Sequence, residues 1–146
     1  MDLEEIKQIS AKEVFSDLNK NNGSFLIDVR SEMEWASIGI PDLEDYGDKL
    51  VLVEYQLYPT MVYNKNFLEE VEKKLNNKSV KTIFFMCKAG VRSQAAAIEA
   101  SALIKKMFGE INIYNVFDGF EGNGFPIFGG KYAGWKNVGL PWKLKD

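Results

Sequence analysis

The chain has 146 residues, of which 46% are hydrophobic and 27% are charged. This ordinary globular composition predicts one domain over residues 1–146 and excludes a disordered or collagen-like chain. Eighteen basic and twenty-one acidic residues give a net charge of −3 without a dense basic run, so we expect no nucleic acid partner. No apolar stretch approaches the roughly 20 residues of a membrane span, and the acidic segment Met1–Glu5 is unlike a signal peptide, so we expect a soluble, cytoplasmic protein.

The first half of the chain alternates short apolar runs with helical patterns. We expect, in order, a strand at Ile6–Ile9, a helix at Ala11–Asn19 capped by Ser10, a buried parallel strand at Phe25–Val29, a helical turn at Ser31–Ser37 and a strand at Lys49–Leu57. Residues 46–63 are rich in aromatic side chains, and we expect them to form an inserted hairpin.

The second half repeats the alternation. It predicts an amphipathic helix at Asn64–Leu75, a strand at Val80–Met86, an Ala-rich helix at Gln94–Phe108 that ends at Gly109, and a strand at Ile111–Phe117. Such alternation indicates parallel strands joined by right-handed crossovers, so the predicted fold is a three-layer α/β/α sandwich with a mostly parallel sheet of about five strands. Residues 119–142 predict a long ordered loop that packs aromatic side chains near one end of the sheet.

Two residue counts exclude whole classes of chemistry. The chain has no histidine, which excludes nucleophile activation by histidine and the usual catalytic zinc sites, so we expect no metal and no cofactor. Its one cysteine, Cys87, excludes a disulfide within the chain. Arginine occurs only at Arg30 and Arg92, which are therefore candidates for positions that need a forked guanidinium.

Cys87 follows the most strand-like run of the chain and opens a loop that leads into a helix. The loop reads Cys87, Lys88, Ala89, Gly90, Val91, Arg92 and Ser93. Ligands of open α/β sheets bind beyond the carboxyl ends of the strands. Loop N–H groups and a helix dipole can stabilise a thiolate there, and the charges of Lys88 and Arg92 suit a small anionic substrate. The pattern predicts that Cys87 is a nucleophile.

Four segments resemble, in the same order, motifs of the single-domain rhodanese-like sulfurtransferases. The loop 87–93 resembles their C-x-x-G-x-R-[ST] active-site loop, and residues 26–35 resemble their [LV]-[IV]-D-V-R-x-x-x-E-[YFW] segment. Residues 116–122 and 134–141 resemble their N-[VL]-x-G-[GF]-x-x and G-W-x-x-x-G-[LF]-P endings. One departure is residues 38–41, which read Ile-Gly-Ile-Pro where many members have G-H-I-P.

The resemblance implies a double displacement in which Cys87 takes a sulfane sulfur from a donor such as thiosulfate or a persulfide. The resulting persulfide passes the sulfur to a thiol or cyanide acceptor, or to a sulfur-relay protein. By the same resemblance, the backbone from Lys88 to Arg92 forms a cradle and Arg92 a charged lip. Asp28 and Arg30 then orient the loop by hydrogen bonds, although a purely structural role in pinning a turn is the more expected one.

Three rival functions remain open. A phosphatase of the cell-cycle type has this fold but a C-x5-R loop, whereas Cys87 and Arg92 have the shorter C-x4-R spacing. A binding module without activity is less expected, because such modules often lack the loop cysteine. A redox sensor with an exposed Cys87 would need a resolving thiol from another molecule. Trp35 and Trp135 are expected to be packing residues.

Overall fold

A computed structural model describes residues 6–122 and 133–146 of the chain. Its central sheet has five parallel strands in the order β1-β8-β7-β2-β4. Their bounds are β1 Ile6–Ile9, β2 Ser24–Asp28, β4 Leu50–Leu52, β7 Thr82–Met86 and β8 Asn112–Val116. The two central strands, β7 and β2, are buried almost throughout, as their apolar sequences require for strands covered on both faces.

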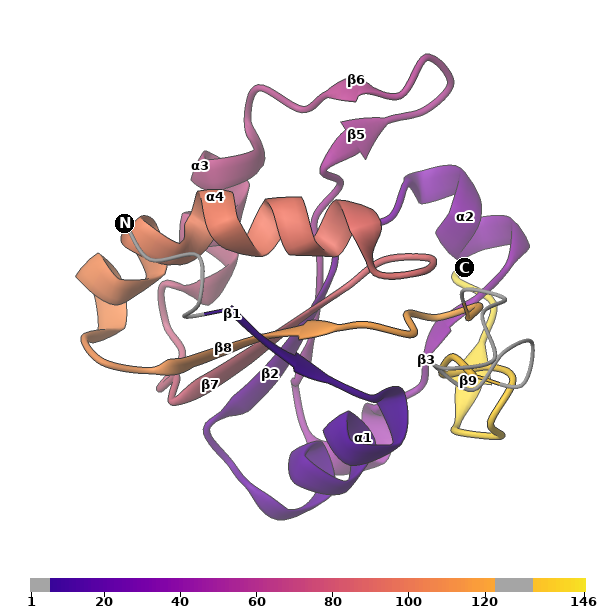
Figure 1. Cartoon of the computed structure of the whole chain (residues 1–146), viewed down its shortest axis with the longest axis horizontal. Helices are drawn as coiled ribbons and strands as arrows, with labels where there is room; N and C mark the ends of the chain where they lie inside the picture. Colours follow the sequence, from indigo (N-terminus) through magenta and orange to yellow (C-terminus); the bar gives the residue numbers. More distant parts are fainter. Residues whose placement is uncertain (1–5, 123–132) are drawn as a thin grey trace.

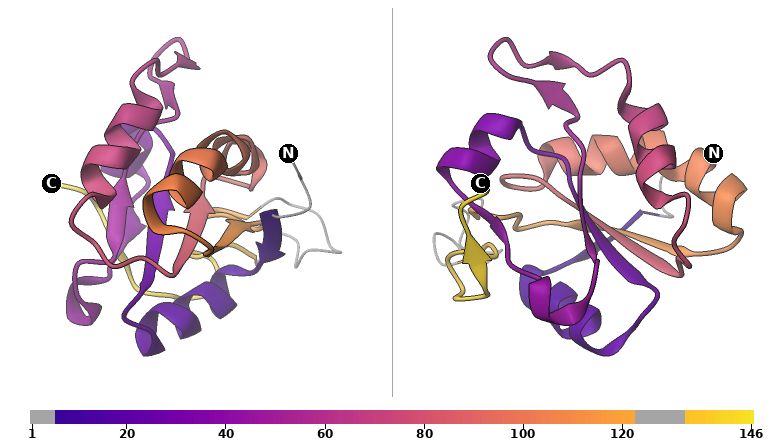
Figure 2. Two further views of the ribbon diagram at one scale, coloured as in Figure 1. Left: turned by 90° about the vertical axis from the view of Figure 1, so that its left-hand side faces the viewer. Right: turned by 180° about the vertical axis from the view of Figure 1, so that it is seen from behind.

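Helices cover both faces of this sheet, which confirms the predicted three-layer fold (Figures 1 and 2). Helix α1 (Ala11–Lys20) packs on one face, and α3 (Phe67–Leu75) and α4 (Val91–Phe108) pack on the other. Alternate side chains of the strands therefore enter two separate cores. Ile83 and Phe85 face α3 and α4, whereas Phe84 and Met86 face α1.

The expected strand over Lys49–Leu57 is wrong as a single element. Strand β4 belongs to the central sheet, whereas β5 (Gln56–Leu57) pairs with β6 (Val62–Tyr63) in the inserted hairpin expected within residues 46–63. Beyond β4 the N–H groups of Val53 and Tyr55 still donate to the carbonyl oxygens of Asp28 and Val29, at 3.1 and 3.2 Å, and the chain then leaves the sheet for the hairpin. The hairpin base is then fixed on α4, where the Tyr55 and Tyr63 hydroxyls both donate to Glu99.

Smaller elements complete the edge of the fold near the C-terminus. Helix α2 (Glu32–Ser37) follows β2, a 3-10 turn covers Glu44–Tyr46, and β3 (Ile40–Pro41) pairs antiparallel with β9 (Trp142–Lys143). The expected aromatic loop over 119–142 lies partly outside the described residues, but Phe120 and Trp135 are fully buried under the α1 face. Within residues 6–122 and 133–146, no helix is long and apolar enough to cross a membrane.

Candidate active site

Cys87 lies where the central strand β7 meets the N-terminus of the 18-residue helix α4. Its side chain is buried, with 1% of its surface exposed, and its Sγ accepts a hydrogen bond of 3.2 Å from the N–H of Gly90. The helix begins at Val91 rather than at the expected Gln94, because Gly90 in a left-handed conformation is its N-cap. Residues 91–93 therefore form the first turn of the helix, whose N–H groups have no acceptor within the helix.

The loop around Cys87 rests on the segment that follows β8. The backbone N–H groups of Phe120 and Glu121 donate to the carbonyl oxygens of Cys87 and Lys88, at 2.9 and 3.0 Å. Gly90 has a φ of 96°, and a Cβ atom there would lie 2.6 Å from the carbonyl oxygen of Phe117. Only glycine therefore fits between the loop and this segment without a shift of the backbone.

A chain of side-chain hydrogen bonds leads from the sulfur towards the surface. The Ser93 hydroxyl lies 3.2 Å from Cys87 Sγ and 2.6 Å from Asn115 Oδ1. The Asn115 amide donates to the carbonyl oxygen of Gly90 and to Gln8 Oε1, at 3.1 and 2.9 Å, so Oδ1 must face Ser93. A hydroxyl has one proton. Ser93 thus donates either to the sulfur or to Asn115, and Asn115 competes with the sulfur for that proton.

Arg92 does not form the free charged lip that we expected. Its guanidinium donates to both carboxylate oxygens of Glu34 on α2, at 2.8 and 2.9 Å. Burial by itself raises the pKa of Glu34, but hydrogen bonds from Arg92 and from Ser31 outweigh it and lower that pKa from 4.5 to about 2. The pair is therefore ionised at neutral pH, and the charge of Arg92 is compensated by a carboxylate.

Asp28 and Arg30 are both fully buried and hold each other, but their hydrogen bonds do not go to the loop. Arg30 donates to both oxygens of Asp28, at 3.0 and 2.7 Å, and to the carbonyl oxygen of Gly39 at 2.8 Å. The guanidinium also stacks over the ring of Phe120, 4.1 Å from its centre. The pair therefore pins the turn at Gly39, in the segment that departs from G-H-I-P, and contacts Phe120, whose N–H donates to the carbonyl oxygen of Cys87.

A cavity of about 440 Å³ opens beside the loop. Lys88 and Arg92 line it from the loop, Met33 and Glu34 from α2, and Tyr58, Pro59 and Met61 from the tip of the inserted hairpin. Ala89 and Val91 of the predicted loop are not in contact with this cavity. Cys87, Gly90 and Ser93 do not line it either, so the hairpin walls one side of a space that meets the loop at Lys88 and Arg92.

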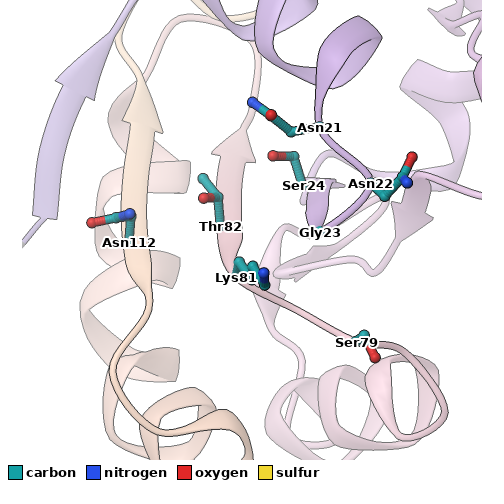
Figure 3. A pocket seen from close by; sticks show the side chains of 8 residues that line it. All are labelled: Asn21, Asn22, Gly23, Ser24, Ser79, Lys81, Thr82 and Asn112. Atoms are coloured by element: carbon teal, nitrogen blue, oxygen red, sulfur yellow. The ribbon is translucent and has the colours of Figure 1, made fainter.

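A second cavity, of about 570 Å³, lies at the opposite edge of the sheet. It is lined by polar side chains at the amino ends of β2, β7 and β8, among them Ser24, Thr82 and Asn112 (Figure 3). It contains neither Cys87 nor the N-terminus of a helix. Among the described residues, no cluster of three or more acidic or cysteine side chains is placed to hold a metal ion in either region.

Sequence reasoning missed two residues of the site. Glu34 stood in the matched segment 26–35, and its partner Arg92 was already a candidate, but their sequence separation concealed the contact. Asn115 interrupts an apolar strand run with a buried amide, and this was a signal that the side chain has a fixed hydrogen-bonding partner.

Comparisons with known proteins identify the family of this chain. The family model described as STR4 middle domain matches residues 6–146. Uncharacterized protein RP600 of Rickettsia prowazekii is 36% identical over 139 residues, which cover 95% of this chain and 98% of that protein. The crystal structure of Rv0390 from M. tuberculosis is 35% identical, covers 95% of this chain and 98% of its own, and superposes with a TM-score of 0.74.

A more distant structure shares the fold. A rhodanese-related protein from Thermoplasma volcanium is 19% identical, with 95% of this chain and 99% of that chain covered, and has a TM-score of 0.53. The parallel five-stranded sheet and its flanking helices are therefore those of rhodanese-like domains. With the family model matching from β1 to the C-terminus, this chain belongs to the STR4 middle domain family, a family of rhodanese-like fold.

Proposed function

We propose that this chain is a sulfurtransferase that carries a sulfane sulfur as a persulfide on Cys87. The observation that supports this most directly is the environment of Cys87 Sγ, which accepts the Gly90 N–H at the N-terminus of α4. A charged acceptor gains about 1.5–3 kcal/mol from such a hydrogen bond. A thiolate is thereby favoured without a histidine.

In the first half-reaction, the Cys87 thiolate attacks the outer sulfur of the donor. A sulfur–sulfur bond forms to Cys87, and the donor's own sulfur–sulfur bond breaks, so that its remainder leaves with the electron pair. In the second half-reaction, an acceptor thiolate or cyanide attacks the outer sulfur, and Cys87 leaves as a thiolate. The partners are therefore a small sulfur donor and a thiophilic acceptor, which can be a sulfur-relay protein.

The rival functions fit the site less well. A redox sensor needs a resolving thiol, and because Cys87 is the chain's one cysteine that thiol would have to come from another molecule. A phosphatase needs an arginine that is free to hold a phosphoryl group, whereas both carboxylate oxygens of Glu34 engage Arg92. A non-catalytic module has no need of the contacts that position Cys87 Sγ.

Intact-mass spectrometry tests the proposal. The protein is incubated with a sulfane donor, desalted and weighed, and we expect a gain of one sulfur, about 32 Da, that cyanide or a thiol removes. The Cys87→Ser protein is the matched control, and it should remain unmodified while keeping its fold. An unchanged mass of the folded wild-type protein with thiosulfate and with organic donors would contradict the proposal.

A further inference from the structure

We propose that the cavity beside the loop selects a sulfur donor with an apolar substituent and no more than a single negative charge, such as an organic thiosulfonate or persulfide, over the dianion thiosulfate. The inference rests on the proposed function and names its donor class. It modifies the expectation that Lys88 and Arg92 together attract a small anion.

The charges around the cavity provide the first argument. Its described lining holds two cations, Lys88 and Arg92, and two carboxylates, Glu34 and Glu121. Both carboxylate oxygens of Glu34 bind the guanidinium of Arg92, and only 17% of the Arg92 side chain and 12% of the Glu34 side chain are exposed. The lining therefore has no excess of positive charge. A dianion would lose hydration there without a matching gain, whereas a monoanion still has Lys88.

The shape and surface of the cavity provide the second argument. A volume of about 440 Å³ is in the range of sites for organic ligands, and far more than a small inorganic anion fills. Its outer wall is apolar, formed by Met33 of α2 together with Tyr58, Pro59 and Met61 of the hairpin tip. Met33 and Tyr58 are 40% and 53% exposed, so an apolar substituent seated there removes their surface from water.

The hairpin is a fixed wall rather than a loose tail. Asn64 follows β6, and its side-chain amide donates to the carbonyl oxygen of Glu54 at 2.8 Å. Its backbone N–H donates to the carbonyl oxygen of Tyr55 at 2.9 Å. The rings of Tyr55 and Tyr63 also pack edge to face, with centres 5.5 Å apart. In Figure 1 the β5–β6 hairpin projects from the sheet on the side of α3 and α4. The base of the insertion is thus fixed, and its tip adds an apolar face beside the loop that carries Cys87.

The chemistry with this donor class is balanced. The Cys87 thiolate attacks the outer sulfur of a thiosulfonate, and the new sulfur–sulfur bond leaves a Cys87 persulfide. The bond between the sulfur atoms of the donor breaks, and the organic sulfinate leaves with the electron pair. The apolar group of the donor stays in the cavity until the sulfinate dissociates.

The test compares benzenethiosulfonate with thiosulfate as donors. The second-order rate constant of persulfide formation is measured by intact mass for each, and is divided by the rate constant of the same donor with a free thiol. This division removes their intrinsic difference in reactivity. We expect a corrected preference of about tenfold or more for benzenethiosulfonate, comparable to what a hydrophobic pocket gains from a small apolar group.

Variants at the hairpin tip locate the cause of the preference. Met61→Asn replaces an apolar residue of the cavity wall, and asparagine tolerates the φ of 58° that Met61 has. Tyr58→Ser is a second variant at the hairpin tip. Each should reduce the preference by about threefold or more. Val62→Ser is the matched control, because Val62 is 54% exposed on the same hairpin but does not line the cavity, and it should leave the preference unchanged.

Glu34→Gln frees Arg92 and should raise the rate with thiosulfate.

Each outcome decides the matter. Equal corrected rates, a preference for thiosulfate, or a preference that neither tip variant reduces would overturn this inference while sulfur transfer stands. A persulfide from neither donor would overturn the proposed function and this inference with it.

Discussion

The two ends of one sheet differ more in chemistry than in shape. Cavities of about 440 and 570 Å³ lie at the carboxyl and amino edges; Lys88 and Arg92 of the Cys87 loop line the smaller one, and no residue of that loop lines the larger. Parallel strands deliver the N-termini of the following helices to the carboxyl edge and the C-termini to the amino edge. Cys87 and the start of α4 thus meet at one edge, whereas Gly109 ends the same helix at the other. Chain direction, rather than cavity size, places the reactive group.

Two glycines at opposite ends of α4 give the strongest test of this contrast. Gly90→Ala places a Cβ 2.6 Å from the Phe117 carbonyl oxygen at a φ of 96°, so the loop must move. We expect a loss of persulfide formation of about 100-fold or more, as misplacement by an ångström can cause, and a loss of about 3 kcal/mol in unfolding free energy. Mass spectrometry and urea denaturation measure the two effects.

Gly109→Ala is the matched control. Its φ is 79°, but a Cβ there meets no atom within 4 Å. It should therefore cost about 1–3 kcal/mol, because its ψ of −149° lies in a backbone region that is essentially restricted to glycine, and leave persulfide formation unchanged. Equal losses of sulfur transfer in both variants would mean that helix stability, rather than the loop, explains the effect of Gly90→Ala.

The ion pair of Arg92 with Glu34 at the carboxyl edge should make the stability of the protein depend on pH in acid. The pKa of Glu34 is about 2 in the fold, below its ordinary 4.5. Its contribution to stability is therefore complete above the ordinary value and is lost as the pH falls from about 4.5 to about 2, with a total of about 3 kcal/mol. Glu34→Gln should be less stable than wild type at pH 7 by up to this amount.

Denaturation at a series of pH values measures this difference. The gap between wild type and Glu34→Gln should shrink through the window from about pH 4.5 to about pH 2. Lys78 and Asp48 form an ion pair that is exposed on its acidic side, so Asp48→Asn is the control and should show little change. A gap that stays constant across the window would contradict the role of Glu34.

A smaller effect separates the two partners of the Ser93 hydroxyl. Asn115→Ala removes the competing acceptor, so Ser93 is free to donate to the thiolate of Cys87, and alkylation by iodoacetamide at neutral pH should accelerate about threefold to tenfold. Ser93→Ala removes the donor, and alkylation should slow. Both variants lose buried hydrogen bonds and stability, so a change in the same direction for both would show that loosening of the fold, not proton competition, governs reactivity.

Much of the fold was open to prediction because its signals are local. The capping box of Ser10 with Glu13 lies within a few residues of sequence, and α1 begins at the predicted Ala11. Helix α2 begins at Glu32, one residue after the expected start, because Ser31 is its N-cap. The split of Lys49–Leu57 was hidden, because its first part pairs with β2 and its last part pairs with β6, in different parts of the chain. A strand run shows its own apolar pattern but not the strand with which each part of it pairs.

The site shows the same division. The position of Cys87 at a strand end and the need for glycine at residue 90 follow from local sequence, and the structure has both features. The pairing of Arg92 with Glu34 joins residues 58 positions apart, and that of Ser93 with Asn115 joins residues 22 apart. Such contacts decide whether a charge or a hydroxyl is free for substrate, and only the assembled sheet reveals them.

The weakest expected effect compares two asparagines on one strand. Asn112 and Asn115 lie towards the amino and carboxyl ends of β8, and the former lines the larger cavity as an exposed side chain. Asn112→Ala should change the unfolding free energy by no more than about 0.5 kcal/mol and leave both persulfide formation and alkylation at wild-type rates. The same substitution at Asn115 changes alkylation, because that amide reaches Ser93. If Asn112→Ala lost sulfur transfer, the amino edge of the sheet would take part in the reaction. The direction of the strands would then not be enough to locate the active site.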